Sequence, residues 1–241
     1  MGSPASFRHL LRSFLPAIMA GSDPSSSIYP TVRISGATSW GPCGSPPVAV
    51  GRQTIWANTN LDWGVDSDQP NTRGIKSYPH VEYTVNKPIS SLSKLTAAVS
   101  ATTPSDGAWE STLDIWADGK QHEIMVWMNY TGTSIGCGKV KPISNNWSSD
   151  GCAIPLHSDV QLSGSYWNVY VGTNDKTAVY SFLRTAKTNT TTIDVLGIMN
   201  YLKSRNYFHD VVIGELQYGF EITSSAGGLR FVSKNFAVTA E

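Results

Sequence analysis

The stretch Leu113-Asp114-Ile115-Trp116-Ala117-Asp118-Gly119-Lys120-Gln121-His122-Glu123-Ile124-Met125-Val126-Trp127 decides the fold, because it has the pattern of a β-hairpin. Asp118-Gly119 is a strong two-residue turn signal, since a type I′ turn needs a positive φ at both central positions. With these two residues as the loop, Trp116 faces Gln121 and Asp114 faces Glu123. The stretch therefore predicts two antiparallel strands of one sheet.

The two predicted strands present different faces, because side chains alternate along a strand. One face is apolar and carries Leu113, Ile115, Ile124 and Val126. The other face combines two carboxylates with large side chains, namely Asp114, Trp116, Glu123, Met125 and Trp127. Carboxylates directly opposite each other destabilise a strand pair, so a hairpin built only for stability would avoid them. Carboxylates beside exposed aromatic rings are what a carbohydrate-cleaving cleft needs.

The composition of the chain narrows the class of protein. Its 241 residues suit a single large β-domain. The 18 basic and 18 acidic residues balance, which gives no electrostatic attraction to nucleic acid or to an acidic membrane surface. No apolar run approaches the ~20 residues that span a bilayer. We therefore expect a secreted monomer that handles carbohydrate, with neither nucleic acid nor membrane as a partner.

Two features lie outside the strand pattern. Residues 1–28 contain Arg8 and Arg12 before a short apolar run that Pro16 interrupts, which is a poor signal peptide. We expect this segment to be a disordered leader or a cloning remnant, and residues 29–241 to form one domain. Among the three cysteines, Cys137 and Cys152 bracket a polar loop that a disulfide could close, for about 3 kcal/mol. The alternative is three unlinked thiols.

Short strands separated by turn signals run along most of the chain. The candidate strands are 31–34, 48–57, 80–85, 95–101, 109–116, 121–128, 165–171, 178–185, 214–222 and 229–239. This regular spacing predicts an all-β sandwich or jelly roll of two antiparallel sheets. Residues 193–203 instead have apolar side chains at helical spacing after Thr191-Thr192 as caps, which predicts one helix packed on the sandwich.

A second strand presents a glutamate in the same way. Between Glu215 and Thr223 every second residue is apolar, and Glu221 lies on the polar face next to Gly219, which leaves room for a ligand. A lone glutamate on such a face is usually solvated surface. Here Asp114 and Trp127 lie on the same predicted face as Glu123, which favours a carbohydrate-cleaving site over a sugar-binding site or a plain surface.

These residues also resemble glycoside hydrolase family 12. The paired motifs are Glu123-Ile124-Met125-Val126-Trp127, after Asp114-Ile115-Trp116, and Gly219-Phe220-Glu221. Lys76-Ser77-Tyr78-Pro79-His80 and the helix at 193–203 also match, and the resemblance covers about residues 35–240. It implies a β-jelly-roll catalytic domain with a concave substrate cleft and a retaining endo-β-1,4-glucanase.

The resemblance implies roles for individual residues. Glu123 matches the nucleophile, Glu221 the acid/base, and Asp114 the Asp that contacts the nucleophile. The expected substrate-binding residues are Trp127, Trp40, Met125, Trp116, Trp63 and His80. Thr38-Ser39 stand where the family has Asn-Asn before the cleft Trp, so Trp63 competes with Trp40 for that position. The segment 132–156 is longer than usual and should border the cleft.

A retaining glycosidase places its two catalytic carboxyls about 5–5.5 Å apart across the scissile bond. We expect an ionised Glu123, a Glu221 kept protonated partly by the charge of Glu123, and an Asp114 that shares a proton or donates a hydrogen bond. No cofactor is expected, and the five histidines show no metal-ligand spacing.

The identity of the substrate stays open at this point. The leading interpretation is cleavage of cellulose-like or mixed-linkage β-glucans, and the alternative within the class is a xyloglucan-specific enzyme. A catalytically inactive glucan-binding protein on the same scaffold is the rival from another class. Such a protein could lose a carboxylate, whereas Glu123, Glu221 and Asp114 are all present here, which argues against it. A xylanase of a related jelly-roll family is disfavoured by the residues around Glu123 and Glu221.

Overall fold

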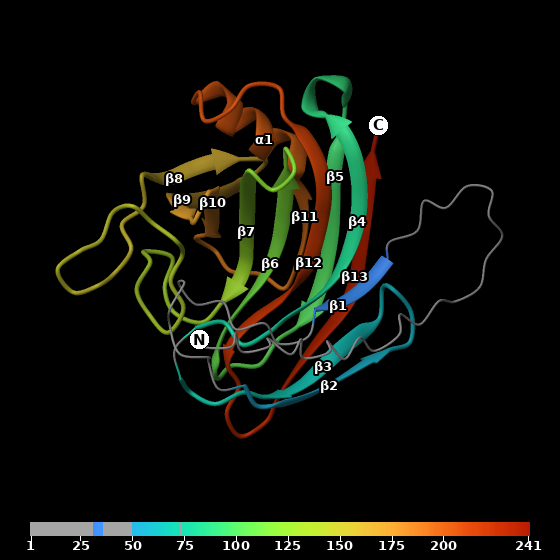
Figure 1. Ribbon diagram of the computed structural model, residues 1–241, viewed down its shortest axis with the longest axis vertical. Helices are drawn as coiled ribbons and strands as arrows, with labels where there is room; N and C mark the ends of the chain where they lie inside the picture. Colours follow the sequence, from blue (N-terminus) through green and yellow to red (C-terminus); the bar gives the residue numbers. More distant parts are fainter. Residues whose placement is uncertain (1–30, 36–49, 73) are drawn as a thin grey trace, which may run out of the picture.

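The computed structural model describes residues 31–35, 50–72 and 74–241, which form two stacked β-sheets and one α-helix (Figure 1). The predicted hairpin is present as β6 (Ala108–Ala117) and β7 (His122–Tyr130). The all-β sandwich with a single packed helix is confirmed for this part of the chain.

The register of this hairpin differs from the predicted one. Asp114 lies opposite Met125, and Glu123 lies opposite Trp116, so the expected direct pairing of Asp114 with Glu123 is wrong. The loop has four residues because its backbone bonds to neighbouring strands: the Asp118 amide donates to Val212 O at 2.9 Å. On the other side, Gln121 O accepts from the Ala178 amide at 2.9 Å. A shift of two residues leaves every side chain on its predicted face.

The larger sheet has eight strands in the order β1-β4-β12-β6-β7-β10-β9-β8. Its other members are β1 (Thr31–Ser35), β4 (Tyr78–Pro88), β8 (His157–Leu162), β9 (Ser165–Asn174), β10 (Thr177–Arg184) and β12 (Val212–Ser224). Neighbours are antiparallel except β7 and β10, which run parallel. The predicted antiparallel arrangement holds except at this pair, where the chain passes through β8 and β9 before it returns beside β7.

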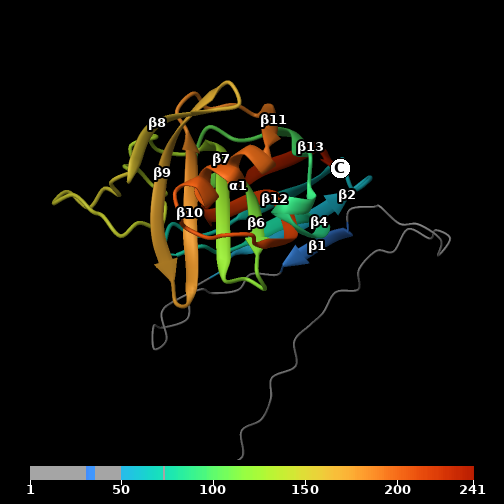
Figure 2. The same cartoon turned by 90° about the horizontal axis from the view of Figure 1, so that it is seen from above.

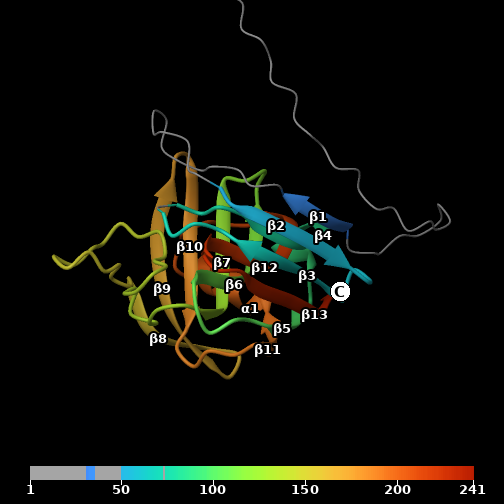
Figure 3. The same cartoon turned by 90° about the horizontal axis from the view of Figure 1, so that it is seen from below.

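The smaller sheet has the order β11-β5-β13-β3-β2. Its strands are β2 (Arg52–Ala57), β3 (Trp63–Asp68), β5 (Leu95–Thr102), β11 (Thr190–Asp194) and β13 (Leu229–Ala240). Seen from below, β2, β3 and β13 lie across the strands of the larger sheet (Figure 3). Strands β3, β8 and β11 were not predicted, since their short sequences are polar and lack a clear alternation.

One hydrophobic core fills the space between the sheets. The Trp63 ring packs 5.7 Å from Phe220, and the Trp109 ring packs 5.7 Å from Phe231, so both contacts join one sheet to the other. The helix α1 (Val195–Ser204) extends this core with Val195, Ile198, Met199 and Leu202 (Figure 2). Its N-cap is Asp194, which accepts from the Gly197 amide at 2.9 Å. The predicted caps, Thr191-Thr192, instead belong to β11.

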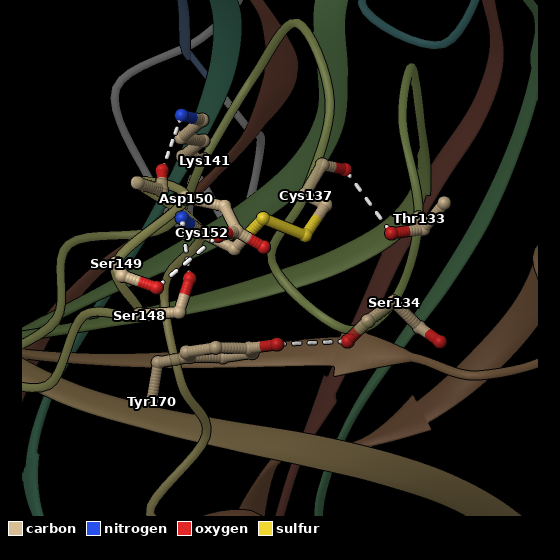
Figure 4. The surroundings of a disulfide bond; sticks show 10 residues. Thr133, Ser134, Cys137, Lys141, Ser148, Ser149, Asp150, Cys152 and Tyr170 are labelled. Carbon is tan, nitrogen blue, oxygen red and sulfur yellow. Dashed lines mark hydrogen bonds between the residues drawn. A yellow bond between two sulfur atoms is a disulfide. The ribbon is translucent and has the colours of Figure 1, made fainter.

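A segment of residues 131–156, here called the disulfide segment, joins β7 to β8 and projects from the sandwich (Figure 1). A disulfide between Cys137 and Cys152 closes it (Figure 4). The segment is fixed to β9, because Ser134 O accepts from the Tyr170 hydroxyl at 2.8 Å and from the Asn168 side-chain amide at 2.8 Å. These hydrogen bonds and the disulfide hold the segment in place against the larger sheet.

Some predictions fall on other parts of the chain. Residues 1–28, Trp40 and Cys43 lie outside the described residues, so their predicted roles stay predictions. Among the described residues, no helix has the length and apolar character needed to span a membrane.

Candidate active site

The site lies on the face of the larger sheet that turns away from the smaller one, here called the outer face. Alternation decides which side chains reach it: Leu113 and Ile115 of β6 point into the core, so Glu110, Asp114 and Trp116 point outward. The same rule places Glu123 of β7 and Glu221 of β12 on this face, because their neighbours are core residues. Three adjacent strands thus bring four carboxyls onto one surface.

These four carboxyls, here called the carboxylate cluster, are buried. The exposed fraction is 3% for Glu110, 1% for Asp114, 7% for Glu123 and 9% for Glu221. Burial disfavours the charged form of a carboxyl, and neighbouring negative charges add to the effect. Buried carboxyls held together add little to the stability of a sheet, and such perturbed groups are typical of functional sites.

Glu221 and Glu110 lie directly opposite each other in the register of β12 and β6. Their side chains share a hydrogen bond. Burial raises the pKa of Glu221 well above its usual value, and the charge and hydrogen bond of Glu110 raise it further. Glu123 makes a smaller contribution in the same direction, so the predicted protonated state of Glu221 has Glu110 as its main electrostatic cause.

Asp114 interacts electrostatically with both predicted catalytic glutamates. Burial raises the pKa of Asp114 well above the usual value, and the charges of Glu221 and Glu123 raise it further. Hydrogen bonds from Thr112, at 2.7 Å, and from Tyr78 oppose this rise. On balance the pKa of Asp114 is raised, which disfavours its ionisation beside Glu123.

The pKa of Glu123 is set by burial and by a nearby positive charge. Burial raises its pKa to about 7, while the nearby Lys120 ammonium lowers it. Lys120 belongs to the hairpin loop and also lies 5.4 Å from the centre of the Trp116 ring. Glu123 is therefore the carboxyl of the predicted catalytic pair that ionises first, as a nucleophile must.

A polar network orients Trp116 beside Glu123. The Trp116 indole N–H donates to Gln217 Oε1 at 3.1 Å. The Gln217 amide donates in turn to Glu82 Oε2 at 3.1 Å and to Glu215 Oε2 at 3.2 Å. Trp116 is half-buried and its polar edge is held from β12, so part of its ring stays exposed.

The other predicted substrate-binding residues have different positions. Trp127 and Met125 are on the outer face but are 2% and 5% exposed, and they pack in a second apolar cluster with Tyr130 and Tyr170. His80 is buried on β4, where its Nδ1 donates to Tyr78 O at 2.9 Å.

Two predictions about access to the site are wrong. Trp63 is 1% exposed and lies in the core between the sheets, so it is not a cleft residue. Gly219 leaves no room for a ligand, because a Cβ there would collide with Pro79 O and lie 2.7 Å from His80 Cβ. The glycine is needed for the close approach of β12 to β4.

A cavity of about 570 Å³ opens near the end of β7, between Trp109, Tyr130 and Lys187, but no member of the carboxylate cluster lines it. The concave substrate cleft over the cluster therefore stays a prediction. Within the described part of the chain, no group of His, Cys, Asp or Glu side chains is arranged to hold a metal ion.

A sequence model described as glycosyl hydrolase family 12 matches residues 43–241. The chain belongs to glycosyl hydrolase family 12. The predicted family is thereby confirmed, and with it the prediction of a glycoside hydrolase at the level of the family.

Several relatives support the family. The xyloglucanase domain of NopAA, a type three effector from Sinorhizobium fredii solved with cellobiose, is 44% identical with a TM-score of 0.81, over 90% of this chain and 94% of that one. A family 12 xyloglucanase from Bacillus licheniformis has a TM-score of 0.66 at 22% identity, over 78% of this chain and 86% of that one, which shows the shared jelly-roll fold.

A curated relative is the xyloglucan-specific endo-beta-1,4-glucanase A of Emericella nidulans, 29% identical over 66% of this chain. The match spans 62% of that protein's length. The corresponding Aspergillus flavus protein, named a probable xyloglucan-specific endo-beta-1,4-glucanase A, is 26% identical over 77% of this chain and 82% of its own length.

The family 12 motifs did not reveal every member of the carboxylate cluster. Glu110 was missed, although it lies four residues before Asp114 and alternation places both on one face. Its meeting with Glu221 depends on the register of β6 with β12, which joins strands about 100 residues apart and has no local sequence signal. Gln217 was missed for the same reason, because its contacts cross between strands, whereas the contact of Lys120 with Glu123 is local.

Proposed function

We propose that this family 12 protein is an endo-acting β-1,4-glucanase that cleaves xyloglucan with retention of configuration. The observation that carries the proposal is the carboxylate cluster, in which Glu123 and Glu221 have different electrostatic environments on neighbouring strands. The relative with the highest identity given above is described as a xyloglucanase domain, which supports xyloglucan as the substrate.

The proposed mechanism uses the two glutamates in turn. Glu123, with the lower pKa of the pair, attacks the anomeric carbon and forms a glycosyl-enzyme. Glu221, with the higher pKa, gives its proton to the departing glycosidic oxygen. Glu221 then removes a proton from the incoming water, whose oxygen displaces Glu123 from the sugar. Both carboxyls end in their starting states.

A glucan without side chains is the second candidate substrate. The Sinorhizobium fredii xyloglucanase domain was solved with cellobiose, a unit that unsubstituted β-1,4-glucans also contain. The same two carboxyls would cleave cellulose-like or mixed-linkage chains. The substrate preference therefore depends on the residues that border the bound glucan.

The test compares reducing-sugar release from xyloglucan, mixed-linkage β-glucan and carboxymethylcellulose. The protein is compared with Glu123→Gln, Glu221→Gln and the control Glu241→Gln, which removes an exposed charge at the C-terminus. We expect the fastest release from xyloglucan, a loss with both site variants and none with the control. Proton NMR of the first product distinguishes retention from inversion.

Other outcomes would contradict the proposal. Release that survives both site variants would place the chemistry elsewhere. No release by a folded protein that xyloglucan still retards in a gel would indicate a glucan-binding protein on a family 12 scaffold.

We also propose that the protein works outside the reducing cytoplasm, since a disulfide in a projecting segment persists in oxidising compartments. Thiol titration of the protein purified without reductant tests this. We expect one thiol at most in the unfolded chain and three after reduction, because Cys137 and Cys152 are paired. Three thiols before reduction would contradict it.

A further inference from the structure

Glu110 has an unusual position for a carboxyl. It lies directly opposite Glu221 in the sheet, both side chains point to the outer face, and their carboxyls share a hydrogen bond. Like charges directly opposite each other destabilise an antiparallel pair, and here both are also buried. Glu110 Oε2 has no hydrogen-bond partner within the described part of the chain.

A hydrogen bond between two carboxyls requires a proton on one of them. Two buried carboxyls that face each other across the sheet resist ionising together, so one of them keeps its proton. Burial and the charge of Glu110 raise the pKa of Glu221 well above its usual value, which favours Glu221 as the carboxyl that keeps the proton. This is the protonation state that a general acid needs before the reaction begins.

We propose that Glu110 is a positioning residue for Glu221, whose carboxylate holds the Glu221 carboxyl protonated and aimed toward the departing oxygen. This proposal rests on the proposed function, because it takes Glu221 as the acid/base. Glu110 does not touch the reacting atoms and acts through Glu221 alone.

The reaction cycle balances with Glu110 unchanged. When Glu221 gives its proton to the glycosidic oxygen, two carboxylates face each other without the hydrogen bond between them. Their repulsion favours the return of a proton to Glu221, which comes from the water that attacks the glycosyl-enzyme. Glu110 thus favours the second step by making the ionised Glu221 a stronger base.

Other titratable groups also face Glu221. Asp114 on β6 and Glu123 on β7 are negative neighbours, and Tyr78 on β4 is coupled to Glu221 and to Asp114. His80 is on β4 opposite Gly219, one outward position away. Among the described carboxyls, Glu110 alone acts on Glu221 through a hydrogen bond as well as through charge, which makes its effect separable.

The test is the pH profile of kcat/KM on xyloglucan for the protein and for Glu110→Gln. A glutamine has the size of the glutamate, lacks its charge and donates to an ionised Glu221. We expect the alkaline limb, which reports the loss of the Glu221 proton, to move to lower pH by about one unit or more. We expect KM to change little, since Glu110 does not contact the sugar.

The control is Glu241→Gln, which removes an exposed carboxylate at the C-terminus, outside the carboxylate cluster. Its alkaline limb should stay in place. An aryl β-glucoside oligosaccharide with a good leaving group, which needs no acid in the first step, should lose less rate than xyloglucan does when Glu110 is changed.

Two results separate the proposals. If the protein cleaves no glucan, or if Glu221→Gln leaves xyloglucan cleavage intact, the proposed function is wrong. If the protein is active with a Glu221-dependent alkaline limb that Glu110→Gln leaves unmoved, Glu110 has only a structural role. If Glu110→Gln does not fold, carbon-13 NMR titration of glutamate carboxyls in the unmodified protein decides, because a Glu221 that ionises together with the exposed glutamates would overturn the inference.

Discussion

The outer face of the larger sheet has two halves that are equally buried and chemically opposite. On β4, β12 and β6, and at the start of β7, the buried side chains are carboxyls and their hydrogen-bond partners. On the rest of β7, on β10 and on β9 they are apolar, and the disulfide segment covers them. The apolar half consists of Met125, Trp127, Tyr130, Tyr170, Val179 and Leu183, with Val140, Ile143 and Ala153 from the segment.

The difference shows how one sheet separates stability from chemistry. Burial of the apolar half removes hydrocarbon from water and stabilises the fold. Burial of the carboxyl half raises the pKa of every member of the carboxylate cluster, which means that the folded state resists their ionisation. Substitutions in the two halves should therefore have opposite effects.

The largest expected effect is on catalysis. Glu123→Gln should lower kcat on xyloglucan by ~1,000-fold or more, because it removes the nucleophile of the proposed mechanism. It should raise the melting temperature at pH 8, because it removes a buried charge near Glu221 and Asp114. Steady-state kinetics and thermal unfolding measure both. A variant that is inactive and also less stable would show that Glu123 is structural, which contradicts the comparison.

Substitutions in the apolar half should lower the free energy of unfolding. Trp127 is 2% exposed and its ring packs 5.7 Å from Tyr130, so Trp127→Ala should lower the free energy of unfolding by about 3–5 kcal/mol. Trp147→Ala is the matched control, since Trp147 is 49% exposed on the disulfide segment and should cost less than about 0.5 kcal/mol. Urea unfolding measures both. Equal losses would mean that the segment and not the sheet determines the stability of this half.

The disulfide segment allows the same half to be weakened from its other side. The double variant Cys137→Ser and Cys152→Ser should lose about 3 kcal/mol, because a closed loop of this length restricts the unfolded chain. Reduction of the unmodified protein should give the same loss. The pH limits of activity should not change, since the pKa shifts of the cluster carboxyls arise from burial, from one another and from Lys120, Thr112 and Tyr78, all of which lie outside the segment. A shifted pH profile would show that the two halves are coupled.

Features that depend on local pattern could be predicted from the sequence, whereas features that depend on contacts between distant strands could not. The alternation of residues 113–127 and 215–223 placed Asp114, Glu123 and Glu221 on one face without any long-range information, because period-two patterning survives a shift of register. The pairing of Asp114 with Glu123 was not predictable, since Asp118 and Gln121 bond to β12 and β10 and lengthen the loop.

Trp63 and Glu110 illustrate what local pattern leaves out. Trp63 begins a short polar strand, and only the docking of the smaller sheet on Phe220 decides that its ring is in the core. Glu110 was on the predicted face, but its importance comes from the strand opposite. The sequence therefore predicted the faces correctly and left the partners across strands undetermined.

The pH dependence of stability tests the carboxyl half directly. Glu110 and Glu123 have pKa values raised from 4.5 to about 7, so the folded state holds more protons than the unfolded state between these values. Stability is then fully present below pH 4.5 and is lost as the pH rises through about 7. We expect each group to account for on the order of 2–3 kcal/mol between pH 4.5 and 8. Urea unfolding across this range should show the fall, and Glu123→Gln should reduce it. A flat profile would contradict the buried cluster.

The smallest expected effect distinguishes a tryptophan on the outer face from one in the core. Trp116 is half-buried, and Gln217 holds its indole N–H at 3.1 Å, so Trp116→Phe keeps a ring for stacking but loses its anchor. We expect KM for xyloglucan to rise about threefold to tenfold, the equivalent of about 1 kcal/mol, with little change in melting temperature. Trp63→Phe should do the reverse, because its ring packs on Phe220 in the core between the sheets. Michaelis–Menten kinetics and thermal unfolding of both variants measure the contrast. A rise in KM with Trp63→Phe would mean that the core transmits strain to the site, whereas an unchanged KM with Trp116→Phe would remove Trp116 from the substrate-binding residues and leave Trp40 as the predicted stacking platform.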